Sequence, residues 1–295
     1  MVNKTFTLSD GNKIPWIGFG TGTALYNQDA SAPVKQAIAN GFTHLDGAQI
    51  YENEDSLGAA IKASGKPRSE LFITTKLSPK FTLAPGESVK ASLKESLKKI
   101  GVDYVDLFLV HQPLPFVNNG TLPALWVGLE GLVKDGLTKS IGVSNFKVSD
   151  LEKLLPEASI PPAVNQIELH PYVWRSAKSI YDFCKSKGIA VASYSGLQPI
   201  TGGKGGPLDD ILPAIAARLS KDYGKTVTPA QVLMKWLIQK DVIIITTTTK
   251  KERIEEYLEA INVPDLTTDE VNQIEENGVK VLKRFYMKHV FPEGE

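Results

Sequence analysis

The chain has 295 residues, 42% hydrophobic and 22% charged, which suits one large globular domain. Lys plus Arg and Asp plus Glu both number 33, so no net charge draws the chain to nucleic acid or to an anionic membrane. Its one cysteine, Cys184, cannot form an internal disulfide and is too little for a zinc cluster, so we expect a cytoplasmic protein without metal. The N-terminal segment lacks an apolar signal core, and the longest apolar runs have only strand length.

Short β-branched or aromatic runs alternate with longer amphipathic segments from one end of the chain to the other. A hairpin is expected at Phe6–Ile14, because Asp10-Gly11 is a strong signal for a tight turn. The short runs predict strands at 17–20, 43–46, 71–76, 105–111, 139–144, 163–169, 189–194 and 242–246. The amphipathic segments predict helices at 31–40, 54–64, 86–100, 121–135, 148–155, 176–187, 228–239 and 250–260.

Start and stop signals agree with these helices. Ser149 or Asp150 is suited to open the helix at 148–155, and Thr228-Pro229 places a proline at a first helical position. Left-handed caps are expected at three glycines that follow helices, namely Gly101, Gly136 and Gly188.

Eight strands alternating with eight helices predict an α/β fold with a parallel sheet. Periodicity alone is compatible with two folds. One is a closed (β/α)8 TIM barrel with an N-terminal β-hairpin, and the other is an open doubly wound sheet. The open sheet often carries a Gly-rich dinucleotide fingerprint, and GFGTGT does not lead into a helix in that pattern. The segment 195–210, with five glycines and two prolines, follows a strand, so we expect a mobile lid there and a single domain over 1–295.

Polar side chains suited to catalysis or cofactor binding mark the ends of successive strands. An ordinary buried strand has little reason to end in a charge, and the carboxyl ends of the strands of a β/α barrel converge on one face, where active sites lie. In chain order these residues are Asp46, Lys76, His111, Ser144 with Asn145, Gln166 within its strand, Tyr194, and Thr246–Thr249 with Lys250.

Four of these segments resemble the motifs of the aldo-keto reductase superfamily, in the family's order. They are GFTHLDGAQIYENEDSLG, DYVDLFLVHQP, KSIGVSNF and VNQIELHPY. The resemblance extends over nearly the whole chain and is greatest to a fungal subgroup that includes conjugated polyketone reductases and ketopantoyl lactone reductase-like proteins. It implies a TIM barrel, NADPH-dependent reduction of aldehydes or ketones, and a catalytic tetrad of Asp46, Tyr51, Lys76 and His111.

The chemistry of these four side chains agrees with that assignment. Tyr51 is a candidate proton donor, and an ammonium beside it, Lys76, is expected to stabilise the phenolate and lower its pKa toward working pH. Asp46 then keeps Lys76 charged, while a neutral His111 orients and polarises the carbonyl oxygen. Taken singly, Asp46 and Lys76 suit a structural ion pair, Tyr51 a packing residue and His111 a core histidine.

Four other residues in these motifs have structural expectations instead. His44 is expected to be structural, His170 to pack at a strand end, and Glu52 with Asn53 to cap the following helix.

For the cofactor, the resemblance implies that Ser144, Asn145 and Gln166 hold the carboxamide and that Tyr194 stacks on the nicotinamide. Amide side chains suit this task because they both donate and accept hydrogen bonds. Thr21, Ser195, Leu197, Thr247 and Thr248 complete the expected site, with backbone groups of 195–206 around the pyrophosphate. The family's usual lysine for the 2′-phosphate is Thr247 here, so we expect Lys250, helped by Arg253, to supply that charge; a solvated helix start is the alternative for Lys250.

Tryptophans that line the substrate pocket in many relatives align with Gly22, Ser78 and Gln112. Trp174, Tyr26, Phe116 and the segment 285–287 are candidates to replace them, with Trp174 assigned to the pocket. An opened pocket favours activated or vicinal dicarbonyls over sugar aldehydes, and a tryptophan at Gly22 is expected to restore preference for small aldehydes. The alternative is that residues 285–291 fold over and refill the pocket.

Two other functions remain alternatives. One is a cofactor-sensing binding protein on the same fold with little turnover; the other is a phosphate-substrate lyase or isomerase that needs no nicotinamide. The expected partner is a small carbonyl substrate, without nucleic acid or membrane, and the expected state is a monomer or weak dimer.

Overall fold

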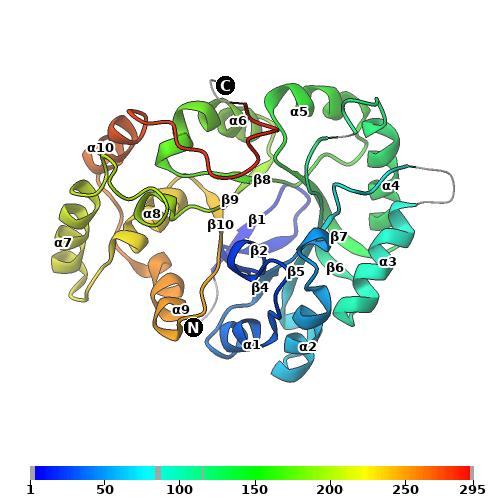
Figure 1. The fold of residues 1–295 in the computed structure, drawn as a ribbon, viewed down its shortest axis with the longest axis horizontal. Coiled ribbons are helices and arrows are strands. Elements are labelled where there is room, and N and C mark those ends of the chain that lie inside the picture. The colour runs from blue at the N-terminus through cyan, green and yellow to red at the C-terminus, as the bar shows by residue number, and fades with distance from the viewer. Residues whose placement is uncertain (1–3, 84–87, 115, 293–295) are drawn as a thin grey trace.

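Eight parallel strands close into a barrel in the computed structural model, which describes residues 4–83, 88–114 and 116–292 (Figure 1). Pairing of the last strand with the first excludes the open sheet. In barrel order from the closing pair, the strands are β10 (Val242–Thr246), β3 (Ile17–Gly20), β4 (His44–Asp46), β5 (Phe72–Leu77), β6 (Val105–Val110), β7 (Thr138–Ser144), β8 (Val164–Glu168) and β9 (Ala190–Tyr194). The strand predictions are thereby confirmed, with each end displaced by one residue at most.

A ring of helices surrounds the barrel (Figure 1). The helices are α1 (Ser31–Ala39), α2 (Glu54–Ser64), α3 (Val89–Ile100), α4 (Leu122–Lys134), α5 (Val148–Leu154), α6 (Trp174–Ser186), α7 (Ile211–Tyr223), α8 (Pro229–Ile238), α9 (Lys251–Glu259) and α10 (Thr268–Gly278). The sequence interpretation missed α7 and α10, because strand–helix alternation does not require them. Both carry readable signals. Leu212, Ile215 and Leu219 form one buried face of α7, and Thr267 with Glu270 forms a capping box at α10.

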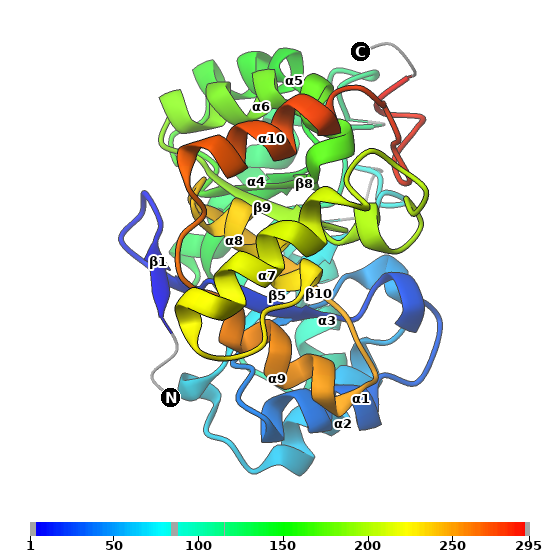
Figure 2. The same cartoon turned by 90° about the vertical axis from the view of Figure 1, so that its left-hand side faces the viewer.

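The N-terminal hairpin closes the bottom of the barrel. Strands β1 (Thr5–Thr7) and β2 (Lys13–Pro15) pair antiparallel, with Phe6 opposite Ile14, and Gly11 takes the positive φ of 85° that the turn requires. Leu8 and Ile14 pack against residues inside the barrel, such as Leu107 and Ile243. The hairpin and the C-terminal segment lie at opposite ends of the molecule (Figure 2).

The capping predictions have mixed outcomes. Thr228 caps α8 with its hydroxyl, and the three expected glycines have φ between 70° and 75°. Asp150 instead occupies the third position of α5, where it accepts the N–H of Lys147 at 3.0 Å. The Asn53 side chain does not cap α2. Its amide donates to the carbonyls of Thr21 and Leu25 at 2.9 and 2.8 Å, and so holds the loop after β3.

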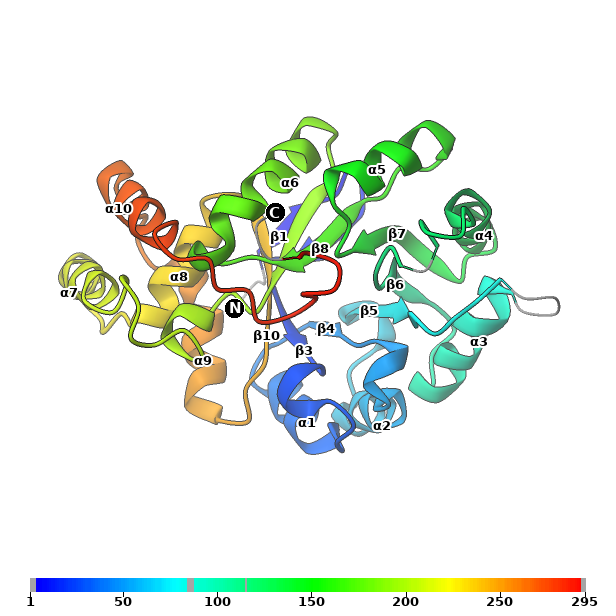
Figure 3. The same ribbon diagram turned by 45° about the horizontal axis from the view of Figure 1, so that its top comes forward.

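The main hydrophobic core lies between the barrel and its helices, and a smaller one fills the barrel interior. Within 4–83, 88–114 and 116–292, no helix has both the length and the apolarity that a bilayer crossing requires. Figure 3 shows the last segment of the chain, after α10, passing across the barrel opening.

Candidate active site

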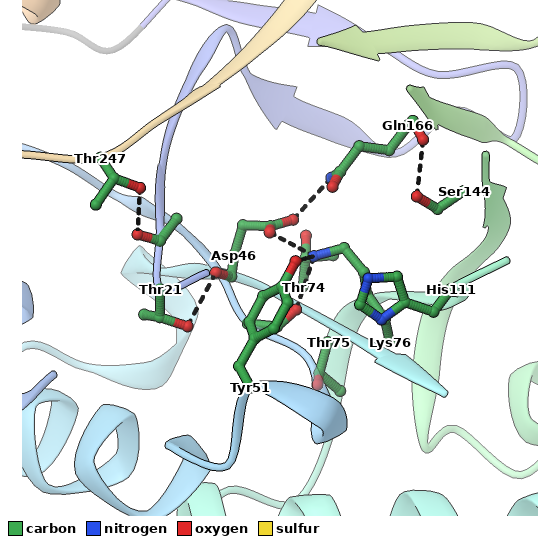
Figure 4. A network of polar contacts seen from close by, with 12 residues as sticks. Thr21, Asp46, Tyr51, Thr74, Thr75, Lys76, His111, Ser144, Gln166 and Thr247 are labelled. Atoms are coloured by element: carbon green, nitrogen blue, oxygen red, sulfur yellow. Dashed lines mark hydrogen bonds and ion pairs between the residues drawn. The ribbon is translucent and has the colours of Figure 1, made fainter. Parts of the chain in front are cut away.

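A cavity of about 640 Å³ opens at the carboxyl end of the barrel. Strand ends form its floor. Its walls come from the loop after β3, the segment that follows β9, and the C-terminal segment. Asp46, Tyr51 and His111 line it directly, whereas Lys76 lies beneath the floor with no exposed surface. The barrel therefore brings all four expected tetrad side chains to one place, from three strand ends and one turn (Figure 4).

The ammonium of Lys76 is held between strand β4 and Tyr51. Its Nζ donates to Asp46 Oδ1 at 2.5 Å and to the Gly47 carbonyl at 2.8 Å. Its distance to Tyr51 Oη is 3.5 Å, the limit of a hydrogen bond. Tyr51 sits on the short 3-10 turn η2 (Gln49–Tyr51), which directs its phenol into the cavity above Lys76. A buried ammonium with one carboxylate partner thus faces one phenol.

Burial and the Lys76 charge act on Tyr51 in opposite directions. Burial raises the pKa of Tyr51, Lys76 lowers it, and the net direction is upward. The expected net lowering is therefore wrong, because removing the phenolate from water costs more than the neighbouring ammonium restores. For Lys76, burial acts to lower the pKa, but Asp46 and Tyr51 raise it and prevail. Lys76 is charged and Tyr51 is protonated at neutral pH.

His111 is a neutral base at the edge of the same floor. Burial, reinforced by the Lys76 ammonium, lowers the pKa of His111 to about 3. The ring stands edge-on to Tyr51 at 5.5 Å between centroids. Its Nδ1 is buried without a hydrogen-bond partner among the described residues, so Nε2 is the nitrogen that can meet a molecule in the cavity.

Amide and hydroxyl groups line the opposite side of the floor. Gln166 Nε2 donates to Asp46 Oδ2 at 2.8 Å, which leaves its carbonyl oxygen and one N–H for another molecule. Ser144 Oγ donates to the backbone carbonyl of Gln166, and Asn145 Oδ1 accepts from the Tyr194 hydroxyl at 2.8 Å. Asn145 Nδ2 is occupied by the His111 carbonyl and Ser144 Oγ. Of the two amide side chains, Gln166 keeps more free hydrogen-bonding groups, and the hydrogen bond to Asn145 fixes the Tyr194 ring at the cavity wall.

A second cavity of about 370 Å³ continues the first between η6 (Gln198–Ile200), α7 and α9. The two share Leu197, Thr201, Arg253 and Tyr257 in their walls. Lys250 lines neither, so the cation that faces both cavities is Arg253. Lys250 sits at the exposed start of α9, ahead of its first turn, so the cavity lining favours Arg253 over Lys250 as the principal charge.

The other expected cofactor residues divide into lining and supporting positions. Ser195 and Thr247 line the main cavity, and Thr247 also donates to the Gly20 carbonyl at 2.7 Å. Thr21 and Thr248 are buried behind the wall. Thr21 donates to the Asp46 carbonyl, and Thr248 Oγ1 accepts the N–H of Lys250.

Most of the expected substrate residues lie outside the cavity. Ser78 N–H donates to Gln49 at 2.7 Å, and Gln112 accepts from His289 at 2.8 Å. Trp174 is buried on α6, where it packs against Trp236 and donates to Glu275. None of the three lines this cavity, so the cavity lining does not support their assignment to the substrate pocket. Phe116, the remaining candidate, is also buried elsewhere in the core.

Gly22 does line the cavity, but it is not a space left by a missing wall. A Cβ built there would lie 2.8 Å from Tyr51 Cζ and 3.1 Å from its hydroxyl. A side chain at this position therefore requires the Tyr51 ring to shift, and the expected preference of a tryptophan variant for small aldehydes stays a prediction. The apolar walls are supplied instead by Tyr26 from the loop after β3, and by Tyr286 and Met287.

The C-terminal segment thus folds over the opening, as the alternative interpretation anticipated. Buried Glu168, at the end of β8, accepts the backbone N–H groups of Phe285 and Tyr286, both at 2.9 Å. Sequence reasoning missed Glu168, although a charge at a strand end is the signal that identified its neighbours. The segment expected to be a mobile lid is also packed, since Gly202 meets Phe285 and Gly206 meets Tyr172 at distances that exclude a Cβ.

A model of the aldo/keto reductase family matches residues 16–278 of this chain. The chain is 39% identical to the NAD/NADP-dependent indole-3-acetaldehyde reductase of Schizosaccharomyces pombe, covering 95% of this chain and 97% of that protein. It is 37% identical to the NADPH-dependent alpha-keto amide reductase of Saccharomyces cerevisiae, covering 93% and 91%. A solved aldo-keto reductase from Bombyx mori in complex with NADP has a TM-score of 0.82 at 31% identity, covering 98% and 97%. The protein belongs to the aldo/keto reductase family.

Proposed function

We propose that this protein is an NADPH-dependent carbonyl reductase in which Tyr51 is the general acid. The observation that carries the proposal is the buried Lys76 ammonium, fixed by Asp46 and directed at a phenol on the cavity floor. A protonated tyrosine offers its proton to a carbonyl oxygen, and the ammonium stabilises the phenolate that remains. His111, neutral and at the same floor, orients that oxygen by donating from Nε2.

The donor set of the two cavities fits a nicotinamide dinucleotide. Gln166 keeps an acceptor and a donor for a carboxamide beside the Tyr194 ring, and the two cavities share wall residues, which suits a two-ended molecule. Arg253 faces both and supplies the cation for a 2′-phosphate, which favours NADPH over NADH. When bound, this cofactor supplies the hydride. The NADPH dependence stated for the Saccharomyces cerevisiae relative and the NADP bound in the Bombyx mori structure support the same choice.

For the substrate we propose activated dicarbonyls. The cavity walls away from the tetrad are apolar, formed by Tyr26, Tyr286 and Met287, and they suit a substrate with more apolar surface than a sugar. Similarity to an alpha-keto amide reductase and, at 36% identity, to the glyoxal reductase of Bacillus subtilis supports this class. A side-by-side assay should give a higher kcat/KM for vicinal diketones than for xylose or glucose. Faster reduction of the sugars would contradict the proposed substrate class.

Replacement of Tyr51 by phenylalanine tests the general acid. Tyr51→Phe removes the hydroxyl alone, so turnover of a diketone should fall by about 10² or more. NADPH affinity, measured by quenching of protein fluorescence, should remain. Lys76→Met should have a similar effect by removing the charge that stabilises the phenolate. A Tyr51→Phe variant that retains most of the wild-type turnover would show that another group donates the proton. A wild-type protein that binds NADPH but reduces no carbonyl would be a binding protein instead.

A further inference from the structure

The distance between the proton donor and its ammonium depends on two elements that have separate supports. Lys76 is on β5 and is held by Asp46 Oδ1 and the Gly47 carbonyl, independently of Tyr51. Tyr51 is on η2, a single turn between β4 and α2. The 3.5 Å between Lys76 Nζ and Tyr51 Oη leaves little margin for movement of that turn.

One side chain joins the two elements outside the cavity. Gln49, the first residue of η2, accepts the backbone N–H of Ser78 through Oε1 at 2.7 Å. Ser78 follows Lys76 by two residues, and Gln49 precedes Tyr51 by two. Because a backbone N–H only donates, this contact fixes the orientation of the Gln49 amide and turns Nε2 toward α3.

The amide nitrogen of Gln49 is held by two serines of α3. Nε2 donates to Ser92 Oγ at 2.9 Å, to the Ser92 carbonyl at 3.2 Å and to Ser96 Oγ at 3.0 Å. Ser96 in turn donates to Glu54 Oε2 at 3.1 Å. The whole Gln49 amide is therefore engaged, and α3 supports the turn from its outer side.

The hydrogen bonds that run from Gln49 through Ser96 to Glu54 reach β5 at Thr75, the residue before Lys76. Glu54, at the start of α2, accepts the Thr75 hydroxyl at 2.6 Å and is nearly fully buried. The strand is thus tied to the η2–α2 segment on both sides of Lys76, through Thr75 and through Ser78. Gln49, Glu54 and Ser96 are not among the residues that line the two described cavities.

We propose that Gln49 is a positioning residue that holds the turn bearing Tyr51 against the strand bearing Lys76, and so keeps the phenol within reach of the ammonium. The inference rests on the proposed role of Tyr51 as the acid. Without Gln49, the turn keeps its backbone contacts but loses its side-chain hydrogen bond to the residue that follows β5. Among the described residues, the 3.5 Å contact between Lys76 Nζ and Tyr51 Oη is then the side-chain hydrogen bond that still joins η2 to β5.

The consequence for titration follows from the groups that face Tyr51. Among the described residues these are Lys76 on β5, Asp46 on β4, His111 after β6, Tyr194 on β9 and Tyr26 in the loop after β3. Lys76 is the cation of this set. If the phenol moves away from it, the pKa of Tyr51 rises, and the alkaline limb of the rate profile moves to higher pH while the plateau falls.

The test is Gln49→Met, which keeps the length of the side chain and removes its hydrogen bonds. Diketone kcat should fall by about tenfold or more, since a shift of about an ångström at a reacting group costs up to 10². The alkaline limb should rise by about half a pH unit or more, while KM and the NADPH Kd change by less than about twofold. Ser96→Ala, which removes one partner of Gln49 and its link to Glu54, should shift the limb in the same direction by less.

The matched control is Gln239→Met. Gln239 makes the same kind of tie far from the cavity, donating to the Leu266 carbonyl at 3.1 Å and accepting its N–H at 2.8 Å. The Gln239→Met variant should have a lower Tm and an unchanged kcat and pH profile. If Gln49→Met behaves like Gln239→Met, the proposal is overturned. Should Gln49→Met not fold, an unshifted limb in Ser96→Ala overturns it instead.

Tyr51→Phe, assayed in parallel, separates the two proposals. Loss of turnover in Tyr51→Phe with a normal Gln49→Met means that only the role of Gln49 is wrong. Retained turnover in Tyr51→Phe means that the assigned acid, and with it this inference, is wrong.

Discussion

Gly22 offers the sharpest test of how the site is packed, because the smallest possible addition reaches the proposed acid. In Gly22→Ala the new Cβ would lie 2.8 Å from Tyr51 Cζ, about 0.7 Å inside an ordinary carbon–carbon contact of about 3.5 Å. The loop cannot readily withdraw, since Asn53 holds the carbonyls of Thr21 and Leu25 on either side of it. The Tyr51 ring must therefore move.

The expected effect is larger on catalysis than on folding. Overpacking of this kind costs about 1–3 kcal/mol of stability. Displacing a phenol that is already 3.5 Å from Lys76 Nζ should lower diketone kcat by about 10- to 100-fold. Steady-state oxidation of NADPH measures kcat, and quenching of protein fluorescence shows whether the cofactor still binds.

Gly131→Ala is the matched control. Gly131 lies within α4, and a Cβ there meets nothing within 4 Å, so the substitution should leave kcat unchanged and stabilise the helix by up to about 1 kcal/mol. A Gly22→Ala enzyme with the turnover of the wild type would refute the reasoning, since it would mean that the ring or the loop yields without cost.

Two further predictions concern the coenzyme and acid stability. Arg253→Ala should weaken NADPH binding by about tenfold to a hundredfold and should change NADH binding little, whereas Lys250→Ala should change the binding of each coenzyme by less than about threefold. If Arg253→Ala weakened the binding of both coenzymes equally, Arg253 would support the cavity wall without contacting the phosphate. Burial lowers the pKa of His44 to about 4 and that of His111 to about 3. Below about pH 6.5 the unfolded chain therefore takes up protons that the folded protein does not. Each histidine should lower the free energy of unfolding by about 2 kcal/mol between pH 7 and pH 5. Denaturant titrations at the two pH values measure this loss of unfolding free energy, which should be smaller in His44→Gln than in the wild type by the contribution of one histidine. An equal loss in the wild type and in His44→Gln would count against a neutral buried His44.

Much of the barrel was predictable because local sequence carries its signals. Alternating runs identify the eight strands, and Thr228, Gly101 and Gly188 mark helix ends through hydrogen bonding and left-handed backbone that depend on few neighbours. The proximity of three of the four expected catalytic side chains was predictable for a related reason. Parallel strands in a barrel end on one face, so Asp46, Lys76 and His111 are brought together by topology alone.

Other features depended on contacts between segments far apart in the chain. That Gly22 touches Tyr51, that Arg253 rather than Lys250 faces the cavities, and that Trp174 packs outside the barrel follow from side-chain directions that sequence spacing does not specify. The net rise in the pKa of Tyr51 likewise reflects desolvation by the whole cavity floor. The sequence by itself determined the alternation of strands and helices and the residues at the strand ends, because strand periodicity and end positions are local, whereas closure of the sheet rests on the pairing of β10 with β3. Only the tertiary structure decided which side chains form the cavity walls and which contacts Gln49 and Glu168 make, because those contacts join η2 to α3 and to the residue after β5, and β8 to the C-terminal segment.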